Sequence, residues 1–148
     1  MPRPMGLRLT LQIALPNLAP VTTQPARINF RFYPDATFVE TTTLRDSDGG
    51  AVDLTGKTAR MQIRRDRDDT EALFELTTEN GGIALGVDGS IALTIAAGDT
   101  YPSLTPAIDR DGEMWWHDLL LSTPGTPVTV ERLYQGNIFV FPGITKPA

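Results

Sequence analysis

The sequence predicts an all-β protein folded as an antiparallel β-sandwich, and three observations favour this class. Apolar and polar residues alternate in many short segments, as in residues 58–64, where Ala59, Met61 and Ile63 are separated by polar or charged residues. This period of two is typical of a strand with one solvated face. Such segments recur about every 8–12 residues with turn signals between them. No ten-residue stretch shows the apolar spacing of an amphipathic helix.

Composition limits both the size and the class of the protein. A chain of 148 residues with 41% hydrophobic residues suits one domain with a packed core. The 13 glycines and 12 prolines suit strands joined by tight turns. A net charge of −5 disfavours a nucleic-acid partner. No apolar run approaches the ~18 residues of a membrane-inserted segment, and the absence of cysteine excludes disulfides and thiolate chemistry.

The N-terminal region holds the clearest alternating pattern of the chain. Its five apolar residues are Leu7, Leu9, Leu11, Ile13 and Leu15. The polar residues between them disfavour a signal peptide, which needs a continuous apolar region. A Pro-rich stretch follows, so we divide the chain into an arm and linker, residues 1–26, and a sandwich domain, residues 27–148. We expect the arm to dock as a strand on another protein or on a neighbouring copy; the alternative is packing on its own sandwich.

Further strands are expected along the body, each bounded by turn residues. They are residues 28–32, 37–44, 58–64, 72–77, 83–85, 91–95, 115–122, 128–134 and 138–141. Residues 96–104 are expected to hold at most one helical turn, because Pro102 interrupts them. The Gln-Gly-Asn sequence at 135–137 is interpreted as the connection that leads from the strand at 128–134 to the one at 138–141.

The candidate catalytic and metal-binding residues lack the arrangement that either kind of chemistry needs. His117 is the only histidine, and Asp118 follows it in a predicted strand, so the two side chains point to opposite faces. The Asp-rich segments 46–49 and 109–113 lack the distal ligands of a calcium loop and are interpreted as hairpin turns. The charged segment 64–71 is either a solvated loop or a docking patch. The sequence therefore predicts no catalytic, cofactor-binding or metal-binding residues, and no enzyme.

Two adjacent tryptophans, Trp115 and Trp116, lie in a predicted strand and so face opposite sides. At least one of them is expected in the core. The other is a candidate for a surface-binding residue, either at a protein interface or stacked on a sugar.

Four segments share their strand-and-turn pattern, in the same order, with a known family. They are residues 52–64, 89–95, 117–121 and 130–140. Over residues 36–145 the chain resembles the immunoglobulin-like domain of tailed-phage tail and baseplate proteins, such as the N-terminal domain of the siphophage baseplate upper protein. The resemblance implies an immunoglobulin-like sandwich without enzymatic activity.

The same resemblance implies a structural component of the virion tail, assembled in the host cytoplasm. Its partners would be other tail or baseplate proteins, in several copies within a symmetric assembly. Because an arm precedes the sandwich and the sequence ends soon after it, we expect an adaptor, collar or decoration role rather than receptor binding. The alternative is a carbohydrate-binding or host-surface-binding module whose site uses Trp115 or Trp116. A metal-dependent hydrolase is disfavoured by the single histidine.

Overall fold

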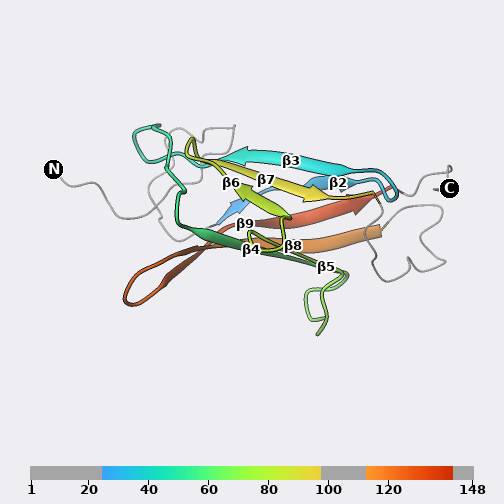
Figure 1. Cartoon of the computed structure of the whole chain (residues 1–148). Coiled ribbons are helices and arrows are strands. Elements are labelled where there is room, and N and C mark those ends of the chain that lie inside the picture. Colours follow the sequence, from blue (N-terminus) through green and yellow to red (C-terminus); the bar gives the residue numbers. More distant parts are fainter. Residues whose placement is uncertain (1–24, 98–112, 142–148) are drawn as a thin grey trace.

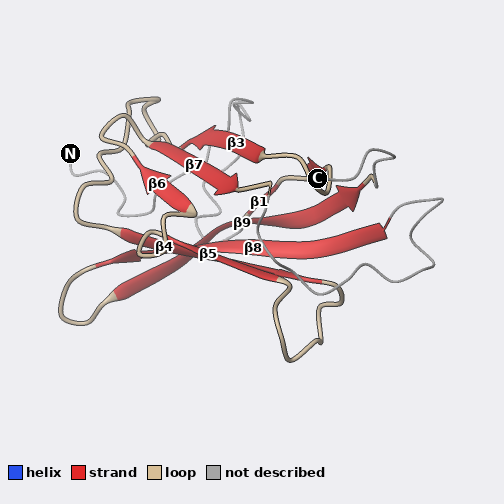
Figure 2. Ribbon diagram, turned by 45° about the vertical axis from the view of Figure 1, so that its right-hand side comes forward, coloured by secondary structure: helices blue, strands red, loops and turns tan. Residues whose placement is uncertain are grey.

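The computed structural model describes residues 25–97 and 113–141, and every regular element in these ranges is a β-strand (Figure 2). The strands are β1 (Ala26–Arg27), β2 (Phe30–Phe32), β3 (Phe38–Thr43), β4 (Thr58–Arg64), β5 (Phe74–Thr77), β6 (Ile83–Leu85), β7 (Ser90–Ile95), β8 (Glu113–Thr123) and β9 (Thr129–Val140). The predicted all-β class is confirmed. The predicted arm strand at 7–15, most of the possible helical turn at 96–104 and the Asp-rich segment from 109 to 112 lie outside the described residues.

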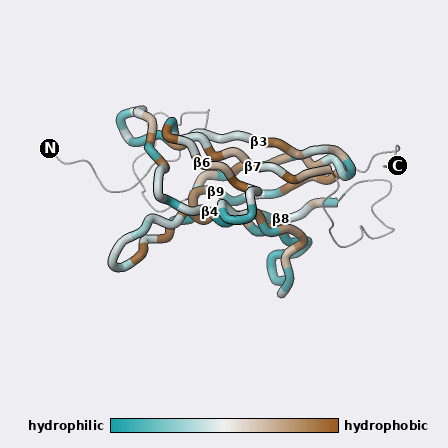
Figure 3. Tube along the Cα trace, in the orientation of Figure 1, coloured by the Kyte–Doolittle hydropathy of each residue, from teal (hydrophilic) through white to brown (hydrophobic). Residues whose placement is uncertain are grey.

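The strands form two sheets that lie one above the other (Figure 1). The larger sheet has the order β1-β9-β8-β4-β5, with β2 also pairing with β9, and the smaller sheet has the order β3-β7-β6. Figure 3 shows hydrophilic residues concentrated in loops such as the one between β4 and β5. The arrangement has the two layers expected of a β-sandwich.

The prediction of a purely antiparallel sandwich is wrong at one edge of the larger sheet. Both β1 and β2 run parallel to β9, with Ala26 opposite Tyr134 and Phe30 opposite Ile138. Between these short strands, the backbone N–H of Ile28 donates to the carbonyl oxygen of Gln135 at 2.9 Å. The two strands therefore form one interrupted edge. Apolar alternation defines the face of a strand but not the direction of its partner, so the sequence pattern could not reveal the parallel pairing.

The prediction of two separate strands at the C-terminal end is also wrong, because β9 is continuous through residues 135–137. Gly136 is needed there for close packing rather than for a turn. A Cβ atom at this position would lie 1.9 Å from the carbonyl oxygen of Ile28. A bulge elsewhere in β9 leaves Leu133 as an extra residue, since Leu119 pairs with Tyr134 and Leu120 with Arg132.

Several other elements agree with the sequence pattern. The structure places strands at 58–64 and 83–85 as predicted, and β7 begins one residue earlier than expected. The turn after β3 is held by Asp46, whose Oδ1 accepts hydrogen bonds from the backbone N–H groups of Asp48 and Gly50, each at 2.9 Å. This arrangement is an Asx turn, in which the carboxylate replaces a backbone acceptor.

The core between the sheets is aromatic at its centre. Trp115 is fully buried, with ring centroids 5.5 Å from Phe32 and 6.2 Å from Phe74. Phe38 of the smaller sheet lies 5.9 Å from Phe32 and joins this cluster to the second layer. Contacts of this kind contribute beyond their buried area, so the cluster fixes how the two sheets sit on each other.

Candidate functional site

The outer face of the six-stranded sheet carries polar side chains in two rows. Met61 and Ile63 of β4 face the core and are buried, so Gln62 and Arg64 face outward. Strand pairing places Gln62 opposite Asp118 of β8, which is in turn opposite Gln135 of β9.

In the second row, Arg64 is opposite Trp116, and Trp116 is opposite Asn137. Arg27 of β1 extends the first row beyond Gln135. The period of two and the strand register together bring residues far apart in the sequence to one surface.

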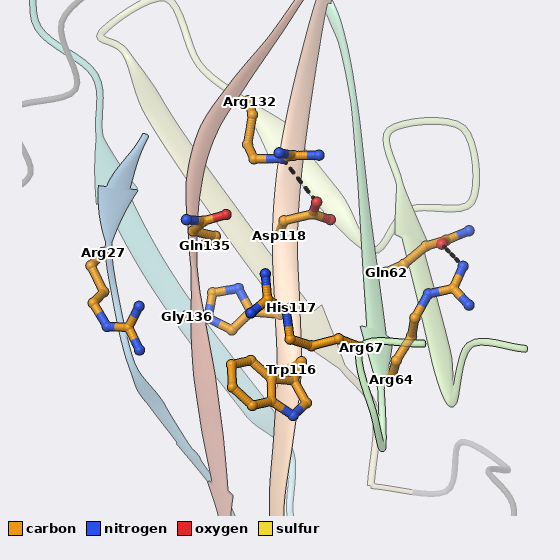
Figure 4. A pocket seen from close by; sticks show the side chains of 10 residues that line it. All are labelled: Arg27, Gln62, Arg64, Arg67, Trp116, His117, Asp118, Arg132, Gln135 and Gly136. Atoms are coloured by element: carbon orange, nitrogen blue, oxygen red, sulfur yellow. Dashed lines mark hydrogen bonds and ion pairs between the residues drawn. The ribbon is translucent and has the colours of Figure 1, made fainter. Parts of the chain in front are cut away.

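These rows line a shallow pocket of about 230 Å³ (Figure 4). It is lined by Arg27, Gln62, Arg64, Arg67, Trp116, His117, Asp118, Arg132, Gln135 and Gly136. We call this set the arginine pocket. Most of its side chains come from strands of one sheet, so the backbone ladder holds their positions.

Trp116 forms the apolar part of the arginine pocket. Its side chain is half-buried, and the guanidinium carbon of Arg67 lies 5.1 Å from the centroid of its ring. Arg67 comes from the loop after β4, so this cation–π contact places a loop cation against a strand aromatic. Figure 4 shows Arg27 on the other side of Trp116 from Arg67. A ligand in the pocket would therefore meet one flat apolar ring between cationic groups.

The other arginines are held by neighbours. Arg64 donates from Nη2 to Oε1 of Gln62 at 2.5 Å and from Nη1 to the backbone oxygen of Asp69. Arg27 donates from Nη2 to Oδ1 of Asn137 at 3.3 Å. These bonds fix two guanidinium groups. Less side-chain conformational entropy is therefore lost when a ligand binds.

Charge in the pocket is predominantly positive. Four of the lining residues are arginines, and Asp118 is the lining residue that opposes them. Asp118 forms an ion pair with Arg132, whose Nε lies 3.0 Å from its Oδ2. The side chains of this pair are 37% and 51% exposed, so the pair contributes little to stability. The arginine pocket thus stands out in a chain whose net charge is −5.

Glu75 of β5 lies beside the two rows, and its carboxylate already has hydrogen-bond and ion-pair partners. Its Oε2 accepts a 2.6 Å hydrogen bond from Nε2 of Gln62 and a 2.6 Å ion-pair contact from Nη2 of Arg60. The hydrogen bond from Gln62, followed by that from Arg60, lowers the pKa of the Glu75 carboxyl. Glu75 is therefore an ionised partner for Arg60 and not a candidate general acid.

His117 and Asp118 diverge, as their adjacent positions in a strand predict. His117 is buried, and its Nε2 lies 2.9 Å from the carbonyl oxygen of Ile28, whereas Asp118 faces Arg132. Burial lowers the pKa of His117 to about 4. A nucleophilic triad needs histidine and carboxylate in contact, and this pair does not meet that condition.

The structure separates the two tryptophans that the sequence singled out. Trp115 belongs to the core, where its Nε1–H donates to Oε2 of Glu113 at 2.6 Å, so it is not a surface-binding residue. Trp116 lies in the arginine pocket. The five apolar arm residues lie outside the described ranges.

Sequence reasoning missed most of the arginine pocket. The alternation in residues 58–64 already placed Gln62 and Arg64 on the solvated face. Arg27, Arg132 and Gln135 carry no comparable signal, because only the register of β9 against β1 and β8 brings them to the same surface. Arg67 belongs to the charged segment 64–71, for which the sequence leaves a solvated loop and a docking patch open, and the structure places it over Trp116.

The arrangement suits binding better than acid–base or metal chemistry. Guanidinium groups present paired donors that match carboxylates or phosphates, and the indole ring adds an apolar platform. Among residues 25–97 and 113–141, no group of three metal-ligating His, Cys, Asp or Glu side chains gathers at one point. The same ranges contain no helix long and apolar enough to cross a membrane. Comparison with protein-family models and with curated protein sequences gives no match.

Proposed function

We propose that the protein is a non-enzymatic structural component of a bacteriophage virion. In this proposal it is an immunoglobulin-like adaptor or decoration protein of the tail, baseplate or collar, and it docks neighbouring tail proteins. The arginine pocket carries the docking part of the proposal: a rigid cationic surface around Trp116, on an otherwise acidic chain. The partner it suits is a protein surface or segment rich in carboxylates.

Strand order supports the immunoglobulin-like part of the proposal. In variable-type immunoglobulin domains, one sheet contains strands D-E-B and the other C′-C-F-G. The orders β6-β7-β3 and β5-β4-β8-β9 correspond to these strand by strand. The edge formed by β1 and β2, parallel to β9, corresponds to a first strand that joins the G strand. The disulfide between strands B and F found in antibody domains has no counterpart, since the chain lacks cysteine.

Exposed apolar side chains on β8 and β9 and just beyond β2 and β9 also support docking. Met114 and Phe139 are opposite each other on β8 and β9, with 44% and 39% of their surfaces exposed. Tyr33 and Phe141 stack with ring centroids 5.6 Å apart, and both are exposed. Protein interfaces combine aromatic residues, methionine and arginine in this way.

Mass spectrometry of purified virions tests the virion proposal. We expect the protein in stoichiometric amounts with the other tail proteins, and its absence from purified particles would contradict the proposal. Co-expression with tail proteins encoded beside it tests docking. A complex on size-exclusion chromatography should be lost with Arg64→Glu and kept with Arg45→Glu. Arg45 is a matched control because it does not line the arginine pocket.

A carbohydrate-binding or host-surface-binding module is the second candidate. The observation that favours it is Trp116, a half-buried ring in a pocket that also holds hydrogen-bonding Gln62 and Gln135. A glycan array probed with the wild type and with Trp116→Ala distinguishes the two functions. Sugar binding that depends on Trp116 would support this module over protein docking.

A further inference from the structure

The arginines of the described chain differ in the groups that neutralise them. Three of them are in ion pairs with carboxylates: Arg60 with Glu75 at 2.6 Å, Arg65 with Glu113 at 3.1 Å and Arg132 with Asp118 at 3.0 Å. Arg27, Arg64 and Arg67 of the arginine pocket form no such pair within residues 25–97 and 113–141. The groups that they contact are amide oxygens, a backbone oxygen and an indole ring.

These neutral contacts hold the three guanidinium groups in place without cancelling their charge. The charge of Arg64 acts on Glu75 only through space, because Arg60 already holds that carboxylate at 2.6 Å. A carboxylate from a ligand would supply the missing counter-charge, and guanidinium–carboxylate pairs are among the stronger hydrogen-bonded contacts.

The strand order fixes how these charges are spaced. Arg64 lies on β4 opposite Trp116 of β8, whereas Arg27 lies on β1, beyond β9. Three strand intervals of ~4.8 Å and an offset of two residues along the strands separate their backbones by roughly 15 Å. Trp116 lies between them, and Figure 4 shows its ring between Arg27 and Arg67. The pocket therefore presents a cation, a ring and further cations in that order.

We propose that the arginine pocket recognises an extended segment of the partner in the pattern acidic-x-apolar-x-acidic. This inference rests on the proposed docking function and names the chemistry of the docked segment. Alternate residues of an extended segment point to one face, and side chains four residues apart are separated by about 13 Å. One carboxylate would pair with Arg27 and the other with Arg64 and Arg67, while the apolar side chain between them covers Trp116.

The centre of the pocket favours an apolar residue over a third carboxylate. Asp118 lines the pocket on β8, two residues from Trp116 and on the same face, so a central carboxylate would meet a like charge. The volume of about 230 Å³ is smaller than the ~300–1,000 Å³ of typical small-molecule sites. It suits a single side chain. Gln135 of β9 also lines the pocket and offers an amide to the backbone of the segment.

Three labelled peptides test this pattern with the full-length protein. The spaced peptide is Gly-Glu-Ser-Leu-Ser-Glu-Gly, and the scrambled peptide, Gly-Glu-Glu-Leu-Ser-Ser-Gly, has the same composition and charge. The third peptide replaces the leucine of the spaced peptide by serine. Seven residues are too few for a stable helix in water, so the peptides sample extended conformations. We expect fluorescence anisotropy to show the spaced peptide binding about fivefold more tightly than either of the others.

Variants of the pocket assign each preference to its residues. Arg27→Gln should reduce the preference for the spaced over the scrambled peptide to under about twofold, and so should Arg64→Gln combined with Arg67→Gln. Trp116→Ala should remove the preference for leucine over serine. Arg45→Gln, outside the pocket, should keep both preferences. Each preference is a ratio measured on one protein preparation, so a loss of folded protein does not change it.

Equal affinity of the wild type for the spaced and scrambled peptides would overturn the inference, as would no binding of the spaced peptide. A preference that survives Arg27→Gln would overturn it as well. The docking function would still stand in these cases if Arg64→Glu abolishes the complex with a tail protein. The two failures are therefore distinguishable.

Discussion

The Nε2 atom of His117 lies 2.9 Å from the backbone carbonyl oxygen of Ile28, which joins β8 to the connection between β1 and β2. The carbonyl can only accept, so Nε2 carries the proton and donates. Nδ1 is buried and has no partner among the described residues. The hydrogen bond to Ile28 is therefore made by the neutral imidazole. Burial lowers the pKa of His117 to about 4.

We predict that His117 makes stability depend on pH between about 4 and 6.5. The folded-state pKa is about 4 and the ordinary value is 6.5, so the unfolded chain binds the proton more readily in that window. Stability is then constant above pH 6.5, falls as the pH is lowered by ~1.4 kcal/mol per unit, and levels off below pH 4, for a total of about 3 kcal/mol. Urea unfolding at several pH values measures this slope.

The matched variant for this prediction is His117→Gln, whose amide can donate to Ile28 but does not titrate. We expect this variant to be less sensitive to pH than the wild type between pH 6.5 and 4. Parallel curves for the two proteins would show that other groups cause the slope.

We predict that Gly136→Ala destabilises the fold by about 2 kcal/mol or more. The added Cβ would lie 1.9 Å from the carbonyl oxygen of Ile28, which is backbone and cannot rotate away, so the edge formed by β1 and β2 would have to shift. Gly125→Ala in the exposed β8–β9 turn is the control, because its nearest contact would be 3.2 Å. Thermal unfolding that shows equal losses for both variants would contradict the proposed close packing.

The two tryptophans should respond in opposite ways to truncation. Trp115→Ala removes a fully buried ring from the aromatic cluster and should cost about 3–5 kcal/mol of unfolding free energy. Trp116→Ala removes a half-buried ring on the outer face and should cost under about 1 kcal/mol. Denaturant titration followed by circular dichroism measures both, and a larger loss for Trp116→Ala would mean that the outer-face ring supports the fold.

Much of the fold could be predicted because strands with one buried face carry their pattern locally. The segment 58–64 is one example: its buried Ala59, Met61 and Ile63 follow the alternation directly. The close approach of Gly136 to Ile28 could not be predicted, because the two residues are remote in sequence. A glycine flanked by polar residues occurs both in turns and in strands where another backbone approaches closely. Only the position of the neighbouring backbone distinguishes a turn from a close approach.

The arginine pocket was predictable only in part, for a similar reason. Local alternation indicates which residues face outward, as it does for Gln62 and Arg64, although it does not decide which of Trp115 and Trp116 does so. It does not indicate which strands are neighbours, and the opposition of Arg64 and Trp116 follows from the pairing of β4 with β8. The site depends on strand order and register, which arise from contacts between distant segments.

The last prediction concerns the ligand class of the arginine pocket. We expect a hexaglutamate peptide to bind the full-length protein weakly and to lose affinity as salt is raised, because exposed charges are screened. Arg64→Glu and Arg67→Glu should each weaken binding about tenfold, since each replaces an attractive charge by a repulsive one. Asp118→Asn should strengthen binding, because it removes a carboxylate from the pocket and frees Arg132 from its 3.0 Å ion pair.

The arginine variants should weaken binding and Asp118→Asn should strengthen it. A folding defect would weaken binding in every variant, so this pattern distinguishes a binding effect from a folding defect. Arg45→Glu is the control for the change in net charge, because Arg45 lies outside the arginine pocket. Fluorescence anisotropy of a labelled peptide at two salt concentrations measures all four variants. If Arg45→Glu weakens binding as much as Arg64→Glu, the peptide responds to overall charge and the pocket is not an anion-binding site. If Asp118→Asn weakens binding, the carboxylate itself contacts the ligand and a polar, uncharged ligand fits the surface better.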